Sequence, residues 1–107
     1  MAATDKLGVI AILRVKLNAT CKNAPEQEWH TDWQISTPSK TCVLYLNDND
    51  GYTEFEDGTI INSLRNRLVL FPCKLKHRST TTTNTRHRLN INTVSYTHLT
   101  LPTKRIV

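Results

Sequence analysis

TCVLYL, residues 41–46, is the stretch that decides the fold, because it is continuously apolar and rich in residues that favour strands. Such a run predicts a strand with both faces covered. The residues that follow, NDNDG at 47–51, are typical of a turn in which Gly51 is free to adopt positive φ. The middle of the chain therefore predicts a β protein.

Further short strands are predicted on both sides of this stretch. Turn residues such as Glu56-Asp57-Gly58 separate them. No segment has the pattern of an amphipathic helix, and residues 59–67 form at most a turn or two. Seven or eight short strands with frequent turns predict an all-β sandwich or barrel. The further expected strands are residues 9–17, 28–35, 52–55, 67–71 and 89–92.

Length and composition set the broad class. The chain has 107 residues, 38% of them hydrophobic and 21% charged, which is ordinary for one small globular domain. No apolar run reaches the ~20 residues that a membrane helix needs. The net charge of +5 favours anionic partners, but the basic residues at 65–88 are not interleaved with aromatic residues, which disfavours nucleic acid.

The cysteines indicate a reducing compartment. Cys21, Cys42 and Cys73 are odd in number and lack zinc-site spacing, which argues against a disulfide framework and a CxxC metal site. We therefore expect a cytoplasmic protein.

The C-terminal segment has a different expected origin. VSYTHLTLPT, residues 94–103, is what one reading frame of a common transposase sequencing adapter encodes. We therefore expect residues 1–93 to be the native core and residues 94–107 to be adapter read-through. His98 lies in that segment and enters no functional argument.

The chemistry is expected at His30-Thr31-Asp32 and at His77. On a strand, residues i and i+2 point to the same side, so His30 and Asp32 present an imidazole and a carboxylate to one face. A second histidine from a distant strand would complete a 2-His-1-carboxylate triad. Such a triad holds Fe(II) on one face of an octahedron and leaves the other positions open.

Three motifs around these residues resemble the prolyl-hydroxylase-like 2-oxoglutarate oxygenases, closest to small phage and bacterial members. TCVLYLN contains a tyrosine, Tyr45, just before Leu-Asn. GYTEF, residues 51–55, is similar to the family's glycine-led strand. NRLVLFPCKLKH, residues 66–77, is similar to the family's strand and turn that precede the distal histidine, which lies at the start of the next strand. The resemblance covers roughly residues 9–93.

The resemblance implies a site. Fe(II) would bind His30, Asp32 and His77, and 2-oxoglutarate would contact Tyr45 and a basic residue nine to eleven positions after the distal histidine. Arg86 and Arg88 both fit that spacing, and Arg86 is preferred because Thr-Arg before an alternating stretch best matches the last core strand. Dioxygen is the other co-substrate, and ascorbate is a compatible cofactor. Neighbours that could shape the pocket are Trp29, Trp33, Asn90 and Asn92.

The implied fold is a cupin-like double-stranded β-helix, or jelly roll, in incomplete form. The implied activity is hydroxylation coupled to decarboxylation of 2-oxoglutarate, with the substrate unidentified. Two departures are visible: no helices precede the first strand, and Arg78-Ser79 replaces the family's usual Thr-Gly or Ala-Gly pair after the distal histidine.

Other functions stay open at this point. One is a cupin-like metal-binding or phage structural module without turnover. A zinc hydrolase is disfavoured because no HExxH motif is present. A basic barrel that binds nucleic acid would use Arg65, Arg67, Lys74, Lys76 and Arg78.

Overall fold

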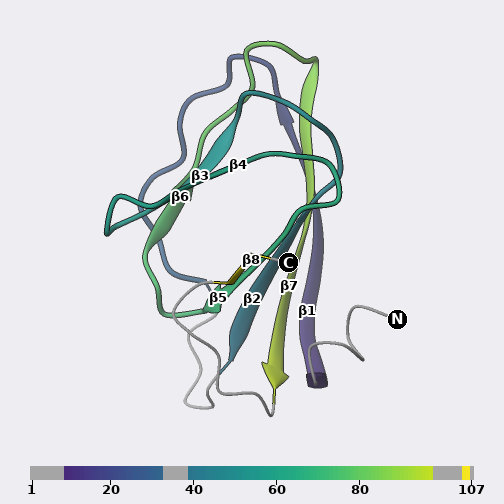
Figure 1. The fold of residues 1–107 in the computed structure, drawn as a ribbon, viewed down its shortest axis with the longest axis vertical. Coiled ribbons are helices and arrows are strands. Elements are labelled where there is room, and N and C mark those ends of the chain that lie inside the picture. Colours follow the sequence, from purple (N-terminus) through teal and green to yellow (C-terminus); the bar gives the residue numbers. More distant parts are fainter. Residues whose placement is uncertain (1–8, 33–38, 98–104, 107) are drawn as a thin grey trace.

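The computed structural model describes residues 9–32, 39–97 and 105–106, which form strands, turns and loops without a helix. One antiparallel sheet has five strands, in the order β1 (Val9–Cys21), β7 (His87–Thr97), β2 (Lys40–Tyr45), β5 (Leu68–Pro72) and β8 (Arg105–Ile106). A second sheet has three strands, in the order β4 (Ile60–Asn62), β3 (Tyr52–Phe55) and β6 (His77–Ser79). Figure 1 shows β1, β7 and β2 running together, with β3 and β6 beside them. The predicted all-β class is confirmed.

The main core lies on the inner face of β2. Thr41, Val43 and Tyr45 alternate along β2 and are buried, as the two-residue period of a strand requires. They share the core with side chains from both sheets, so burial of these apolar groups joins the layers. The core cluster consists of Val43, Tyr45, Phe55, Ile61, Val69 and Phe71.

The outer face of β2 is also partly covered. Cys42 and Leu44 are half-buried and pack against Leu68 and Leu70 of β5. This agrees with the expectation, drawn from its continuous apolar run, that the central strand is covered on both sides.

One expectation about the turns was wrong. Gly58 has φ 92° and donates its backbone N–H to Phe55, closing the β3–β4 hairpin. Gly51, the glycine that was expected to adopt positive φ, is not among the positive-φ residues. Because Gly51 has no side chain, Arg88 can pack closely against its backbone.

Several element bounds differ from those expected. β1 extends to Cys21 because it pairs with β7 over its whole length. Residues 60–62 form β4 instead of a helical turn, since pairing with β3 satisfies their backbone groups. Around His30 only an isolated bridge forms, and residues 33–35 of the expected strand lie outside the described residues.

β7 runs from His87 to Thr97, so the expected native boundary after residue 93 falls inside a strand. Adapter origin of residues 94–107 stays a prediction, because a strand can form from residues of either origin.

We predict that Leu70→Ala lowers the free energy of unfolding by about 2–5 kcal/mol, the usual cost of truncating a buried leucine. Leu70 is 1% exposed. The matched control, Leu17→Ala, removes the same atoms from a side chain that is 67% exposed and should change stability by less than about 0.5 kcal/mol. Urea unfolding monitored by tryptophan fluorescence measures both, and equal losses would contradict this description of the sheet.

Candidate metal centre

A short antiparallel bridge places His30 directly opposite His77. The backbone N–H of each residue donates to the carbonyl of the other, both at 3.0 Å, and the N–H of Asp32 donates to the carbonyl of Cys73 at 3.0 Å. His77 is the first residue of β6, as the resemblance implies. Two distant parts of the sequence therefore meet through backbone hydrogen bonds.

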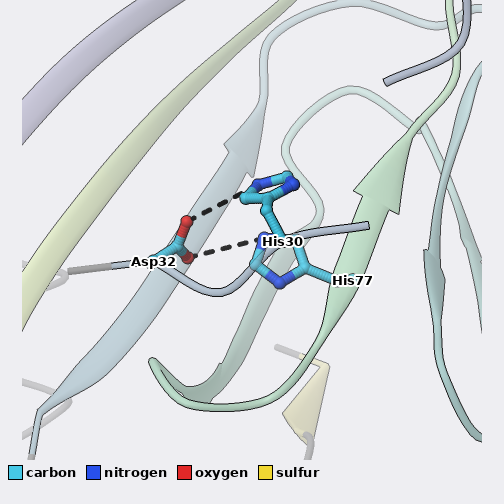
Figure 2. A group of neighbouring side chains, drawn as sticks. All are labelled: His30, Asp32 and His77. Carbon is cyan, nitrogen blue, oxygen red and sulfur yellow. Dashed lines mark ion pairs between the residues drawn. The ribbon is translucent and has the colours of Figure 1, made fainter. Parts of the chain in front are cut away.

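The side chains of His30, Asp32 and His77 converge on one point, as Figure 2 shows. Asp32 Oδ1 lies 3.8 Å from Nε2 of His30, and Asp32 Oδ2 lies 3.5 Å from Nε2 of His77. All three potential ligand atoms lie within 4.8 Å of one another. Atoms that bind one ion at ~2.1 Å are about 3 Å apart in an octahedron, so small side-chain shifts would let this cluster bind a divalent cation.

Hydrogen bonds on the far side of each imidazole select the ligand atom. Nδ1 of His30 lies 2.9 Å from the carbonyl oxygen of Glu28, and Nδ1 of His77 lies 2.9 Å from that of Leu75. A carbonyl oxygen only accepts, so each Nδ1 carries a hydrogen. In the neutral rings, both Nε2 atoms are therefore left with lone pairs that face Asp32 and are available to a metal ion.

Thr41 positions the carboxylate. Its hydroxyl, fully buried on β2, donates to Asp32 Oδ2 at 2.6 Å and lies 3.2 Å from Sγ of Cys73. Burial alone would raise the pKa of Asp32, but hydrogen bonds from protonated His77 and from Thr41, together with the positive charges of protonated His77 and His30, outweigh it and lower that pKa. Asp32 is therefore an anionic ligand at neutral pH.

The donor set is imidazole and carboxylate without thiolate. None of the three free cysteines belongs to the cluster, and burial raises the pKa of Cys42 to about 11, so it stays a thiol. The fit is therefore to a metal such as Fe(II), whose facial triads use these ligands.

Aromatic rings enclose the distal histidine. His77 is 3% exposed, and its ring centroid lies 4.8 Å from that of Phe71 and 6.0 Å from that of Phe55. His30 is more accessible, and its ring contacts His77 at 4.4 Å between centroids. The triad thus has one packed side and one open side.

The open side faces a cavity of about 670 Å³, a volume in the range of small-molecule sites. Its lining includes the three triad residues, and on the sheet it follows alternate residues of β1 and β7. Asn90 and Asn92 belong to this lining, as the sequence suggested. Asn90 accepts a hydrogen bond from Nδ2 of Asn18 at 3.0 Å.

Arg88 lies in the wall of the cavity with its charge buried. It is 2% exposed, donates from Nε to Ser63 at 3.0 Å and from Nη2 to Thr53 at 3.3 Å, and its guanidinium lies 5.5 Å from the centre of the Tyr45 ring. Burial lowers its pKa, and the Tyr45 phenol partly offsets this. Among the described residues no carboxylate pairs with it. A buried cation without a counter-ion favours an anionic ligand.

The preference for Arg86 over Arg88 disagrees with this geometry. Arg86 is exposed, precedes β7 and does not line the cavity. The two arginines were expected to share a side because they are two residues apart, but β7 begins at His87, so the strand period does not reach Arg86. Of the two arginines, Arg88 is the one that lines the cavity.

Gly51 makes room for Arg88. A Cβ at this position would lie 2.7 Å from Cδ of Arg88 and 2.8 Å from the backbone oxygen of Thr81. Any larger residue would therefore displace the arginine or the loop behind it.

Tyr45 lies beneath the cavity and does not line it. It is fully buried, and its hydroxyl lies 2.8 Å from Oγ1 of Thr53, which also accepts from Arg88. Burial raises the pKa of Tyr45, partly offset by the Thr53 hydrogen bond and the charges of Arg88 and Arg67. Tyr45 therefore contacts Thr53 and Arg88, both of which line the cavity.

The remaining candidates lie elsewhere. Trp29 is exposed and stacks against the guanidinium of Arg78 at 4.5 Å, while Trp33 lies outside the described residues. Arg78 also pairs with Glu54 at 2.9 Å, so one of the five cations considered for nucleic-acid binding is already neutralised. Neither Thr41 nor Thr53 was predicted from the sequence, although Thr41 shares a face of β2 with Tyr45 and Thr53 shares a face of β3 with Phe55.

The comparisons with known proteins concern the fold. A prolyl-4-hydroxylase from Pseudomonas putida superposes with a TM-score of 0.64 at 18% identity, over 91% of this chain and 60% of that one. A cupin protein from Bacteroides fragilis superposes with a TM-score of 0.61 at 11% identity, over 92% of this chain and 76% of that one. The chain has a cupin-like jelly-roll fold.

The candidate centre therefore lies in a jelly roll, the fold that this chain shares with the prolyl-4-hydroxylase and the cupin protein. The chain spans about 60% of the length of the prolyl-4-hydroxylase. No protein-family model matches the sequence, and no curated protein matches it. Within the described residues, no helix has the length and hydropathy needed to cross a membrane.

We predict that Thr41→Val weakens binding of Co(II) by about 10–100-fold, because loss of a hydrogen bond to a ligand usually costs that much affinity. The same change should raise the pKa of Asp32, since one hydrogen bond to its ionised form is lost. Thr41→Ser keeps the hydroxyl and is the control. Visible absorption of bound Co(II) and a carboxyl carbon NMR titration provide the measurements; equal affinity of the valine and serine variants would show that Thr41 does not position Asp32.

Proposed function

We propose that the protein is a non-haem Fe(II) and 2-oxoglutarate-dependent dioxygenase that hydroxylates its substrate. The observation that carries this proposal is the pairing, in one cavity, of a two-histidine, one-carboxylate cluster with a buried arginine that has no carboxylate partner among the described residues. A metal cluster alone fits many functions. The buried guanidinium of Arg88 lies apart from the metal cluster and would pair with the second carboxylate of a co-substrate that binds the metal through its first.

The roles of the residues follow from their contacts. His30, Asp32 and His77 would hold the metal on one face and leave its other positions toward the cavity. Arg88 would bind the far carboxylate of 2-oxoglutarate through charge-assisted hydrogen bonds. Thr53 and Tyr45 would keep the guanidinium in place, because Thr53 accepts from Arg88 and contacts the Tyr45 hydroxyl.

The bound metal, 2-oxoglutarate and dioxygen would supply the oxidising chemistry: one oxygen atom enters the substrate as a hydroxyl, and the other enters succinate as carbon dioxide leaves. The protein contributes orientation and electrostatics. Thr41 holds the Asp32 carboxylate, and the rings of Phe55 and Phe71 shield His77 from water. Ascorbate as a cofactor and a cytoplasmic location are further parts of the proposal.

A cupin-like metal-binding module without turnover is the second candidate, because the fold is equally that of a cupin. A metal-binding module without turnover would not require a buried arginine without a carboxylate partner in the same cavity as its metal. The two candidates therefore differ in whether 2-oxoglutarate binds and is consumed.

We predict that His77→Ala reduces Fe(II)-dependent succinate formation from 2-oxoglutarate by at least about 100-fold, because a metal ligand is lost. His30→Ala should do the same, and it alters a more exposed ring, so it guards against a simple folding defect. His87→Ala, outside the cavity lining, is the matched control and should retain activity. Circular dichroism checks each fold; full turnover without His77 or His30 would rule out the dioxygenase.

We predict that Arg88→Gln weakens 2-oxoglutarate binding by about 10–100-fold, the range expected for loss of a charge-assisted hydrogen-bond pair. Arg86→Gln removes the same charge from an exposed position and should leave binding unchanged. Calorimetric titration of the Mn(II)-loaded protein without oxygen measures both. If the Arg86 variant loses affinity and the Arg88 variant keeps it, the assignment of the carboxylate site to Arg88 is wrong.

A further inference from the structure

We propose that the cavity contains a second anion-binding subsite, formed by Arg14, Lys16 and Asn92, which holds the acidic group of the substrate. This inference rests on the proposed function and names a substrate class for it. The class is a small acid, with a carboxylate or phosphate group, that also carries an N–H or O–H donor near that group.

The strand register places this subsite level with the metal cluster. Arg14 on β1 pairs with Val94 on β7, and Val94 pairs with Thr41 on β2, whose hydroxyl donates to Asp32. Arg14 and Thr41 are thus two strand spacings apart, or about 10 Å between their backbones. A small molecule bound by the Arg14 side chain can therefore extend to the metal.

The β1 side of the cavity carries two positive charges, both on solvent-exposed side chains. Arg14 and Lys16 lie on β1, the edge strand of the five-stranded sheet, and both line the cavity. The carboxylate in the lining is Asp32, which is committed to the metal cluster. Neither Arg14 nor Lys16 forms an ion pair within the described part of the chain. Two free cations at the open edge favour entry of an anion.

Asn92 adds a requirement for a donor. Its Oδ1 is buried and has no hydrogen-bond partner among the described residues, whereas Oδ1 of Asn90 accepts from Asn18. Asn92 pairs with Lys16 across β1 and β7. A buried acceptor without a donor is costly, so a ligand that supplies an N–H or O–H at this point gains affinity.

This subsite is separate from the one assigned to 2-oxoglutarate. Alternate residues of β1, from Arg14 to Thr20, line the cavity. Arg88 pairs with Thr20, at the end of this stretch that lies away from Arg14 and Lys16. Its guanidinium contacts Ser63 and Thr53, which lie on or beside the second sheet. The cavity therefore provides one cation for the co-substrate and two for another acid.

The test uses the full chain loaded with Mn(II) and saturated with 2-oxoglutarate, with N-acetylglycine as the probe. Paramagnetic broadening of the probe's proton NMR signals reports binding close to the metal without any turnover. N-acetylglycinamide lacks the charge, acetoxyacetate replaces the N–H by oxygen, and N-acetylaminomethylphosphonate replaces the carboxylate. We expect N-acetylglycine or its phosphonate counterpart to bind more tightly than the amide and the acetoxy acid; the tighter of the two identifies the acid.

The double variant Arg14→Gln/Lys16→Gln should weaken probe binding by about tenfold and leave broadening of 2-oxoglutarate unchanged. The control, Arg65→Gln/Lys74→Gln, removes the same charge from exposed residues outside the cavity lining and should change neither. If N-acetylglycinamide binds as tightly as N-acetylglycine, or if the two double variants weaken binding of N-acetylglycine equally, the anion subsite is wrong. Neither result contradicts the dioxygenase. Absence of 2-oxoglutarate broadening counts against the dioxygenase, and the same probe without 2-oxoglutarate then decides whether the anion subsite exists.

Discussion

The backbone bridge between His30 and His77 is the constraint on which the site depends. A metal triad built from two distant segments needs a connection that fixes both in register, and two reciprocal hydrogen bonds at 3.0 Å provide it. The bridge is extended by the hydrogen bond from Asp32 to Cys73, so main-chain contacts position all three residues of the candidate metal cluster. Side-chain hydrogen bonds then orient each donor atom, which leaves little freedom for the cluster to rearrange.

A second constraint is the burial of a cation. Arg88 occupies space that the missing side chain of Gly51 leaves open, and neutral hydroxyls of Ser63 and Thr53 hold it. Neutral partners orient the guanidinium but do not cancel its charge, so an anion that bound here would gain the full free energy of pairing with it. The candidate metal cluster and the cation thus line one cavity. β6 carries His77, β7 carries Arg88, and the segment bridged to β6 carries His30 and Asp32.

Much of the fold was predictable because its signals are local. The central apolar run at 41–46 indicated a strand, and Glu56-Asp57-Gly58 indicated a turn after residues 52–55, and the structure has both. The short β4 strand was not predictable, since its residues pair only because β3 is available beside them. The placement of Thr41 was within reach, because it lies on the same face of β2 as Tyr45 and alternation along a strand is a local rule.

The sequence by itself determined the all-β class and nominated His30, Asp32 and His77, because strand period and motif spacing are properties of neighbouring residues. Only the tertiary structure decided that these three side chains meet, that Arg88 and not Arg86 lines the cavity, and that Arg14, Lys16 and Asn92 face the same space. The physical reason is register. Which residues lie opposite one another depends on the pairing of β7 with β1 and β2, on the bridge between His30 and His77, and on where each strand begins. These long-range contacts are not encoded in the spacing of any single segment.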